Sequence, residues 1–109
     1  DDVIRRLVAY AEAGADCLYA PGLSTREDIS AVVLAVAPKP VNVLIAADIG
    51  LTVADLAALG VRRVSVGSAL ARVAFTAFRQ AAEDIAAHGR FTAFAGVDPL
   101  GVINARFRG

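Results

Sequence analysis

Three short apolar segments constrain the fold of this chain most, because they recur at regular intervals and alternate with helical patterns. We predict strands over residues 16–20, 41–46 and 62–66. The segments begin roughly 20 to 25 residues apart, which is typical of parallel strands joined by right-handed crossover helices. The pattern therefore predicts an α/β fold in which each strand is followed by a helix.

Helix signals fill the intervals between these strands. Apolar side chains spaced as on one helical face precede the first strand, and Gly14 predicts that this helix ends near Ala13. Ser24 and Glu27 fit a capping box for a second helix, which Pro38 ends. The apolar face of that helix would carry Ile29, Val32, Val33 and Val36.

The later helices have similar signals. Thr52 and Asp55 repeat the cap chemistry for a helix over residues 53–59, which Gly60 closes. The longest helix is predicted over residues 68–87, and Gly89 ends it. Residues 98–99, Asp-Pro, give one more helix start in the tail.

The high apolar content supports strands that are buried on both faces. Hydrophobic residues make up 57% of the 109 residues, above the usual share for a soluble domain. The longest uninterrupted apolar run, residues 31–37, is far too short to span a bilayer, and the first residues lack the regions of a signal peptide. Doubly buried strands imply a parallel sheet covered by helices.

Charge and cysteine content narrow the function classes. Lysine plus arginine equal aspartate plus glutamate at 11 each, which disfavours a nucleic-acid binder. The single Cys17 excludes an internal disulfide and a cysteine-cluster metal site, and it fits a reducing cytoplasm. Because the chain has no methionine and opens with Asp1 inside a helical pattern, we expect a piece of a longer protein.

The junction between the third strand and the longest helix is one candidate binding site. Gly67 lets the chain turn, and Ser68 can cap the helix that follows. Unpaired N–H groups at such a helix start bind anions, and ligands of parallel α/β proteins lie at the carboxyl ends of the strands. The alternative is an ordinary turn between strand and helix, with Ser65, Gly67 and Ser68 serving only capping and packing.

Asn42 is the best single candidate within a strand. An amide in a doubly buried strand is costly unless its hydrogen bonds are satisfied. By the two-residue period, Asn42 and Leu44 share one face, from which Asn42 could bind a carboxylate or phosphonate. The alternative is a structural amide that ties adjacent strands or loops together. Asp48 follows the same strand and could touch a ligand, although loop aspartates mostly form turns.

Other polar residues are expected to serve structure. Arg62 and Arg63 lie at the amino end of their predicted strand, the end that faces away from catalysis in a barrel. Cys17 has no basic neighbour in an apolar strand and is expected to be a buried, inert thiol. His88 lies at a helix end, where a cation interacts favourably with the helix dipole.

Four motifs together resemble one family along nearly the whole chain. The motifs are residues 9–16 (AYAEAGAD), 21–22 (PG), 40–44 (PVNVL) and 60–70 (GVRRVSVGSAL). Each motif alone is weak, whereas the combination is specific. On these motifs the sequence is similar to the isocitrate lyase / phosphoenolpyruvate mutase superfamily, in the subgroup of phosphoenolpyruvate-mutase-like proteins.

The resemblance implies a partial (β/α)8 barrel, with residues 1–109 as the carboxyl-terminal part of one barrel domain: about the last three strands with their helices. It implies a parent enzyme in which magnesium holds a small 2-oxo acid while C–C or P–C bonds are cleaved or formed. The family's metal-binding acidic residues and its catalytic cysteine or gate loop lie on earlier strands. The resemblance therefore carries over no metal ligand or catalytic residue to this chain, and we expect the chain alone to be inactive.

The residues expected to bind the substrate, a small carboxylate or phosphonate, are Asn42, Gly67 and Ser68. A homo-oligomer is expected as the assembly, with no nucleic-acid or membrane partner, in the cytoplasm. Two alternatives stay open: part of another phosphate-binding barrel enzyme, since late-strand Gly-Ser turns often bind phosphate, and a non-catalytic fragment that only associates with partners.

Overall fold

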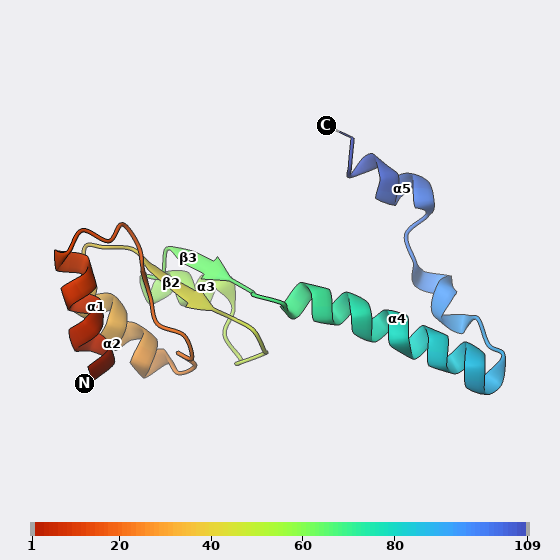
Figure 1. The fold of residues 1–109 in the computed structure, drawn as a ribbon, viewed down its shortest axis with the longest axis horizontal. Helices are drawn as coiled ribbons and strands as arrows, with labels where there is room; N and C mark the ends of the chain where they lie inside the picture. Colours follow the sequence, from red (N-terminus) through yellow and green to blue (C-terminus); the bar gives the residue numbers. More distant parts are fainter. Residues whose placement is uncertain (1, 109) are drawn as a thin grey trace. The chain divides into compact units, whose positions relative to one another are not determined.

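The computed structural model describes residues 2–108 and divides into two compact units, Asp1–Leu70 and Ala71–Gly109. The first unit alternates helices and strands in the predicted order (Figure 1). Its elements are α1 (Asp2–Glu12), β1 (Leu18–Tyr19), α2 (Arg26–Val36), β2 (Val41–Leu44), α3 (Val53–Ala58) and β3 (Arg63–Ser65). Each strand is shorter than the apolar segment that predicted it.

The three strands form one parallel sheet, which confirms the predicted α/β class. The strand order is β1-β2-β3, so β2 is central and pairs with both neighbours. Tyr19 pairs with Asn42, and Asn42 pairs with Arg63. Paired residues in a sheet point to the same face. This row of side chains therefore lies on one face, and Val41 and Val43 point to the other.

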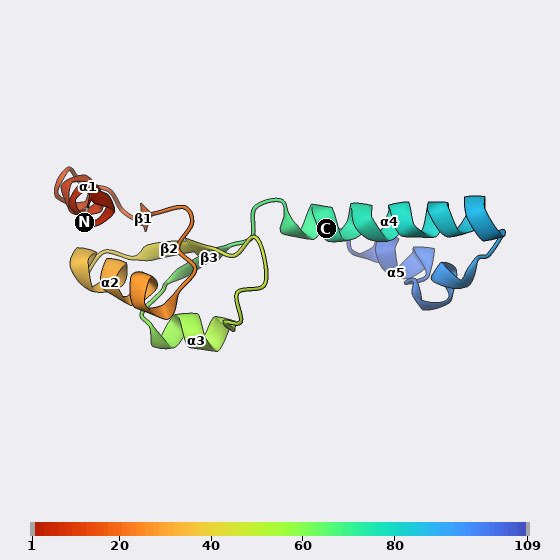
Figure 2. The same ribbon diagram turned by 90° about the horizontal axis from the view of Figure 1, so that it is seen from below.

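The hydrophobic core lies on the face of the sheet that α2 and α3 cover (Figure 2). Val41 and Val43 of the central strand have no exposed surface, because helical side chains pack over them. The core residues of the helices include Leu7 of α1, Ile29, Val32 and Val36 of α2, and Leu56 of α3. The opposite face is more open: Tyr19 is 45% exposed, and Arg63 is exposed as well.

One predicted helix cap is confirmed and another is wrong. Thr52 and Asp55 form a capping box at the start of α3, each accepting a hydrogen bond from the other's backbone N–H. The cap of α2 is Thr25 and not Ser24, because the Thr25 hydroxyl accepts from the N–H of Asp28 at 3.1 Å. The acidic residue three positions after the cap is accordingly Asp28, one place beyond Glu27.

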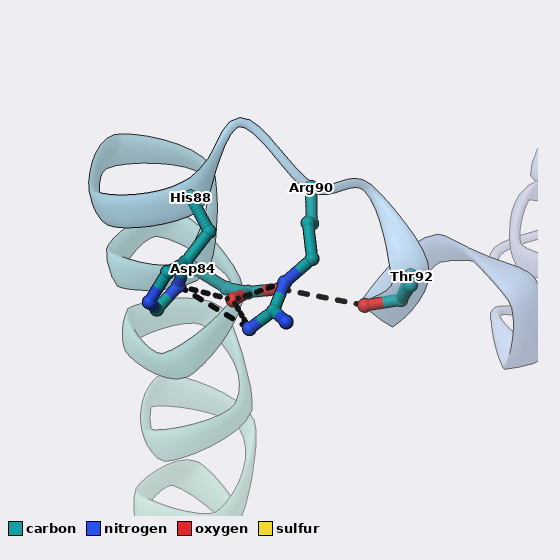
Figure 3. Close-up of polar contacts among 4 residues, drawn as sticks. All are labelled: Asp84, His88, Arg90 and Thr92. Carbon is teal, nitrogen blue, oxygen red and sulfur yellow. Dashed lines mark hydrogen bonds and ion pairs between the residues drawn. The ribbon is translucent and has the colours of Figure 1, made fainter.

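The long helix α4 (Ala69–His88) begins at the end of the first unit, and the 3-10 helix η1 (Thr92–Gly96) and α5 (Leu100–Ala105) follow. Asp84 closes the turn after α4 (Figure 3). It accepts hydrogen bonds from Arg90, at 2.6 and 3.1 Å, and lies 2.9 Å from Nδ1 of His88 and 3.4 Å from the Thr92 hydroxyl. The Arg90 guanidinium, with His88 and Thr92, lowers the pKa of Asp84.

The second unit has no buried residue among positions 71–108. Its amphipathic pattern is nevertheless pronounced, with large apolar side chains that remain exposed. Phe75 and Phe78 of α4 are each 73% exposed, and Phe91 and Phe94 contact one another at a ring separation of 5.8 Å. Within residues 2–108, none of the helices combines the length and apolarity that a membrane crossing requires.

Candidate functional site

The carboxyl ends of the three strands meet along one edge of the sheet. Three connections leave this edge: residues 20–25 after β1, residues 45–52 after β2, and residues 66–68 after β3. In parallel α/β proteins the loops at this edge carry the ligand site. The predicted site residues Gly67 and Ser68 lie at the edge itself, and Asn42 lies within the central strand.

Asn42 is buried in the sheet, with 5% of its surface exposed. Its side-chain Nδ2 donates a hydrogen bond to the hydroxyl of Ser65 on β3, at 3.0 Å. Its Oδ1 is buried and has no hydrogen-bond partner within residues 2–108. The Asn42–Ser65 hydrogen bond joins neighbouring strands, as expected if Asn42 is a structural amide, but it leaves the buried acceptor Oδ1 unsatisfied. Such an acceptor is costly unless a donor reaches it.

Gly67 makes the turn that follows β3. Its φ of +52° is in the left-handed region, and an added Cβ would lie 3.4 Å from the Leu44 side chain. The helix α4 starts at Ala69, one residue later than predicted. The N–H of Ala69 donates to the carbonyl of Val66 at 3.0 Å, so this N–H is not available to an anion. Any anion at this turn must therefore be held without it.

The structure also places three other residues that the sequence singled out. Asp48 Oδ1 accepts a hydrogen bond from the N–H of Gly50 at 2.8 Å, which is the turn role considered for it. Cys17 is partly buried, and its sulfur lies 3.8 Å from the Leu18 carbonyl oxygen. Arg63 lies on the Asn42 face of the sheet, a placement that follows from the strand register and not from the sequence alone.

An ion pair at the same edge was missed by the sequence analysis. Arg26, the first residue of α2, donates to Asp55 of α3 at 2.5 Å. The Thr52 hydroxyl, the Arg26 guanidinium and the Thr52 N–H all bond to the Asp55 carboxylate and hold its pKa well below the ordinary value. The local pattern predicted the Thr52 cap, whereas the pairing with Arg26 joins residues that are distant in sequence.

A metal site does not fit the residues that the structure describes. Among residues 2–108 there is no group of three or more His, Cys, Asp or Glu side chains placed to hold a metal ion. Magnesium binds through several oxygen ligands, usually including one or two carboxylates. The magnesium implied by the family resemblance would therefore need ligands outside this set of residues.

Comparisons with known proteins identify the family. Residues 1–86 match the family model described as phosphoenolpyruvate phosphomutase. Over 65 residues the chain is 42% identical to an uncharacterized protein of Mycobacterium tuberculosis, a match that covers 60% of this chain and 24% of that protein. The chain thus spans about a quarter of the length of this curated relative.

Solved structures agree with this assignment. A candidate lyase/mutase from Burkholderia cenocepacia J2315 is 51% identical with a TM-score of 0.89, covering 98% of this chain and 39% of that one. Oxaloacetate acetylhydrolase in complex with the product oxalate is 29% identical with a TM-score of 0.72, and the match covers 96% of this chain and 36% of that one. Phosphoenolpyruvate phosphomutase from Streptomyces platensis subsp. rosaceus is 28% identical with a TM-score of 0.75, and the match covers 96% of this chain and 38% of that one.

These matches confirm the family that the sequence motifs resembled. The family model covers most of the chain, and the structural relatives include lyases and mutases that act on small acids. The chain belongs to the phosphoenolpyruvate phosphomutase family.

Proposed function

We propose that this chain is the carboxyl-terminal part of a (β/α)8 barrel in a magnesium-dependent lyase or mutase. The parent enzyme cleaves or forms C–C or P–C bonds in small 2-oxo acids. The observation that carries this proposal is the family match over residues 1–86, together with the chain's coverage of only 39% of the Burkholderia cenocepacia relative. Three parallel strands are also too few to close a barrel, which needs about eight.

Within that barrel, Asn42, Gly67 and Ser68 form part of the pocket wall and bind the carboxylate or phosphonate of the substrate. Support comes from the unsatisfied Oδ1 of Asn42, which marks a buried polar group with unused hydrogen-bonding capacity. The Ser65 hydroxyl can donate as well as accept. If the amide turns over and accepts from Ser65, its Nδ2 is left to donate to a carboxylate.

The core chemistry is assigned to residues outside this chain. When bound, magnesium would supply Lewis-acid stabilisation of the developing oxyanion charge. Gly67 and Ser68 would bind and orient the acid at the carboxyl edge of the sheet, and Asn42 would contact it from the face of the central strand. The chain alone is therefore inactive, and activity belongs to a longer protein that includes the earlier strands.

Turnover assays test this assignment. The purified 109-residue chain should show no magnesium-dependent turnover of oxaloacetate or 2-methylisocitrate, whereas a longer protein that adds the preceding strands should turn over a small acid of this kind. Measurable turnover by the short chain would contradict the assignment of the chemistry to residues elsewhere. An inactive longer protein, tested over a panel of small 2-oxo and 2-hydroxy acids, would contradict the proposed activity.

An NMR titration tests the proposed anion contact at the turn. Oxalate or phosphate should shift the amide signals of Gly67 and Ser68 first, because these residues form the connection at the edge of the sheet. The Ala69 amide should move less, since it already donates to Val66. Unmoved signals at Gly67 and Ser68, with shifts elsewhere, would reject this site.

A further inference from the structure

One ion pair joins the starting points of two helices at the carboxyl edge of the sheet. Arg26 begins α2, directly after the connection over residues 20–25. Asp55 lies in the first turn of α3, directly after the connection over residues 45–52. The guanidinium Nη2 of Arg26 and Oδ1 of Asp55 are 2.5 Å apart. The contact thus bridges the two loops where each one enters its helix.

The two oxygens of Asp55 have separate partners. Oδ2 accepts from the N–H of Thr52 at 2.9 Å and from its hydroxyl at 2.5 Å, while Oδ1 accepts from Arg26. Thr52 is the last residue before α3. Arg26 therefore acts on the end of the 45–52 loop through Asp55, and replacing Arg26 removes this link without removing the helix cap.

The opposite end of α3 is held by packing instead. Leu56 in the helix is 2% exposed, and Gly60, just after it, fits so closely that an added Cβ would lie 2.9 Å from Val33 Cγ1 of α2. At the start of α3 the link to α2 is the charged pair. A cation in the first turn of a helix is disfavoured by the helix dipole. At Arg26 this cost is offset by Asp55 and by the acidic residues Glu27 and Asp28 in the same turn of α2.

We propose that Arg26 is a positioning residue: through Asp55 it holds the 20–25 and 45–52 loops in a fixed relation at the rim of the ligand site. An exposed ion pair contributes little to global stability, so its effect falls on these two loops. The effect of Arg26 on the order of the two loops does not depend on what the protein binds, whereas its effect on ligand binding rests on the function proposed above.

Hydrogen–deuterium exchange followed by mass spectrometry tests the positioning role in the unliganded chain. Arg26→Ala should speed exchange in peptides covering 20–25 and 45–52 by about two- to fivefold, the factor expected for an exposed ion pair. Arg26→Lys, which keeps the charge, should restore part of the protection. Arg79→Ala serves as the matched control, because it breaks an exposed pair with Glu83, at 2.7 Å, on α4. That control should leave both loops unchanged.

The outcomes separate the two parts of the proposal. Unchanged exchange of both loops in Arg26→Ala would overturn the positioning role. If the two loops exchange as fast in Arg26→Lys as in Arg26→Ala, the positioning role is also contradicted, because the charge at position 26 would then not matter. A second arm adds oxalate, which should slow loop exchange in the wild type and less in Arg26→Ala. If oxalate has no effect on either protein while the unliganded difference persists, the ligand proposal fails and the positioning role stands.

Discussion

Replacing Gly60 by alanine should destabilise the first unit through two separate effects. The φ of Gly60 is +88°, a backbone conformation that costs an L-residue about 1–2 kcal/mol. The new Cβ would also lie 2.9 Å from Cγ1 of Val33, so the Val33 side chain or the backbone around Gly60 must shift, and overpacking of this kind costs about 1–3 kcal/mol. We therefore expect the free energy of unfolding to fall by about 2–5 kcal/mol.

Gly22 offers a matched control for the backbone effect. Its φ of +87° is almost the same as that of Gly60, but an added Cβ would meet nothing within 4 Å. Gly22→Ala should therefore cost only the backbone term, about 1–2 kcal/mol. The reduced freedom of the unfolded chain affects both variants in the same way and cancels in the comparison. Urea unfolding followed by circular dichroism compares both free energies, with wild type and variants at one dilute concentration at which the chain is monomeric.

A double-mutant cycle isolates the contact with Val33. In a Val33→Ala background the Cγ1 methyl is absent. The loss of unfolding free energy caused by Gly60→Ala should then fall to the loss caused by Gly22→Ala. Equal destabilisation by Gly60→Ala and Gly22→Ala in the wild-type background would refute the reasoning, because the close approach of α3 and α2 at Gly60 would then have no energetic consequence.

Three further predictions concern charge, ligand and assembly. Because the pKa of Asp55 is lowered in the folded chain, its stabilising effect should be fully present above about pH 4 and disappear as the pH falls through the lowered value. The urea midpoints of the wild type and Asp55→Asn should accordingly differ at pH 7 and converge in strong acid. In a longer, active protein, Asn42→Ala should weaken substrate binding more than it weakens folding, and KM should rise about ten- to a hundredfold because a hydrogen bond to a charged ligand is lost. A lower midpoint at unchanged KM would make Asn42 structural. Sedimentation over a concentration series should show the isolated chain associating into ill-defined oligomers, and one monomeric species with a cooperative melt would contradict this.

The sequence predicted the order of the elements because each boundary has local chemistry. Thr52 and Asp55 gave the start of α3, and Gly60 gave its end. The choice of Ser24 over Thr25 failed because both hydroxyl residues have an acidic residue three positions later. Only the backbone conformation distinguishes the two possible caps, and local pattern does not contain it.

The strands are shorter than predicted for a related reason. An apolar segment shows that a strand is possible, whereas a strand forms only where a neighbour supplies ladder hydrogen bonds. β1 pairs with β2 alone, over Leu18–Tyr19, and β3 also has one neighbour. The apolar residues beyond the pairing are consistent with the proposed barrel, in which further strands would extend the ladder.

The contacts at the candidate site depend on register and packing. Asn42 was identified from its sequence context as a polar group in a buried strand, but its bond to Ser65 depends on how β2 and β3 are aligned. The Arg26–Asp55 pair likewise depends on two helices starting at the same edge of the sheet. Sequence patterns identify a residue that needs a partner, and tertiary structure decides which partner it has.

In the second unit, too, the sequence pattern identifies apolar side chains that need partners but does not identify those partners. The pattern of α4 predicts an apolar face, and the structure leaves Val73 and Phe78 at least 67% exposed. In proteins most of the stability of an amphipathic helix comes from the packing of its apolar face, and full burial of one such side chain is worth about 1.5–3 kcal/mol. The stability of α4 must therefore come largely from a surface that covers this face. Because residues 71–108 bury no side chain among themselves, that surface is not supplied by this unit, and the predicted association follows from the same deficit.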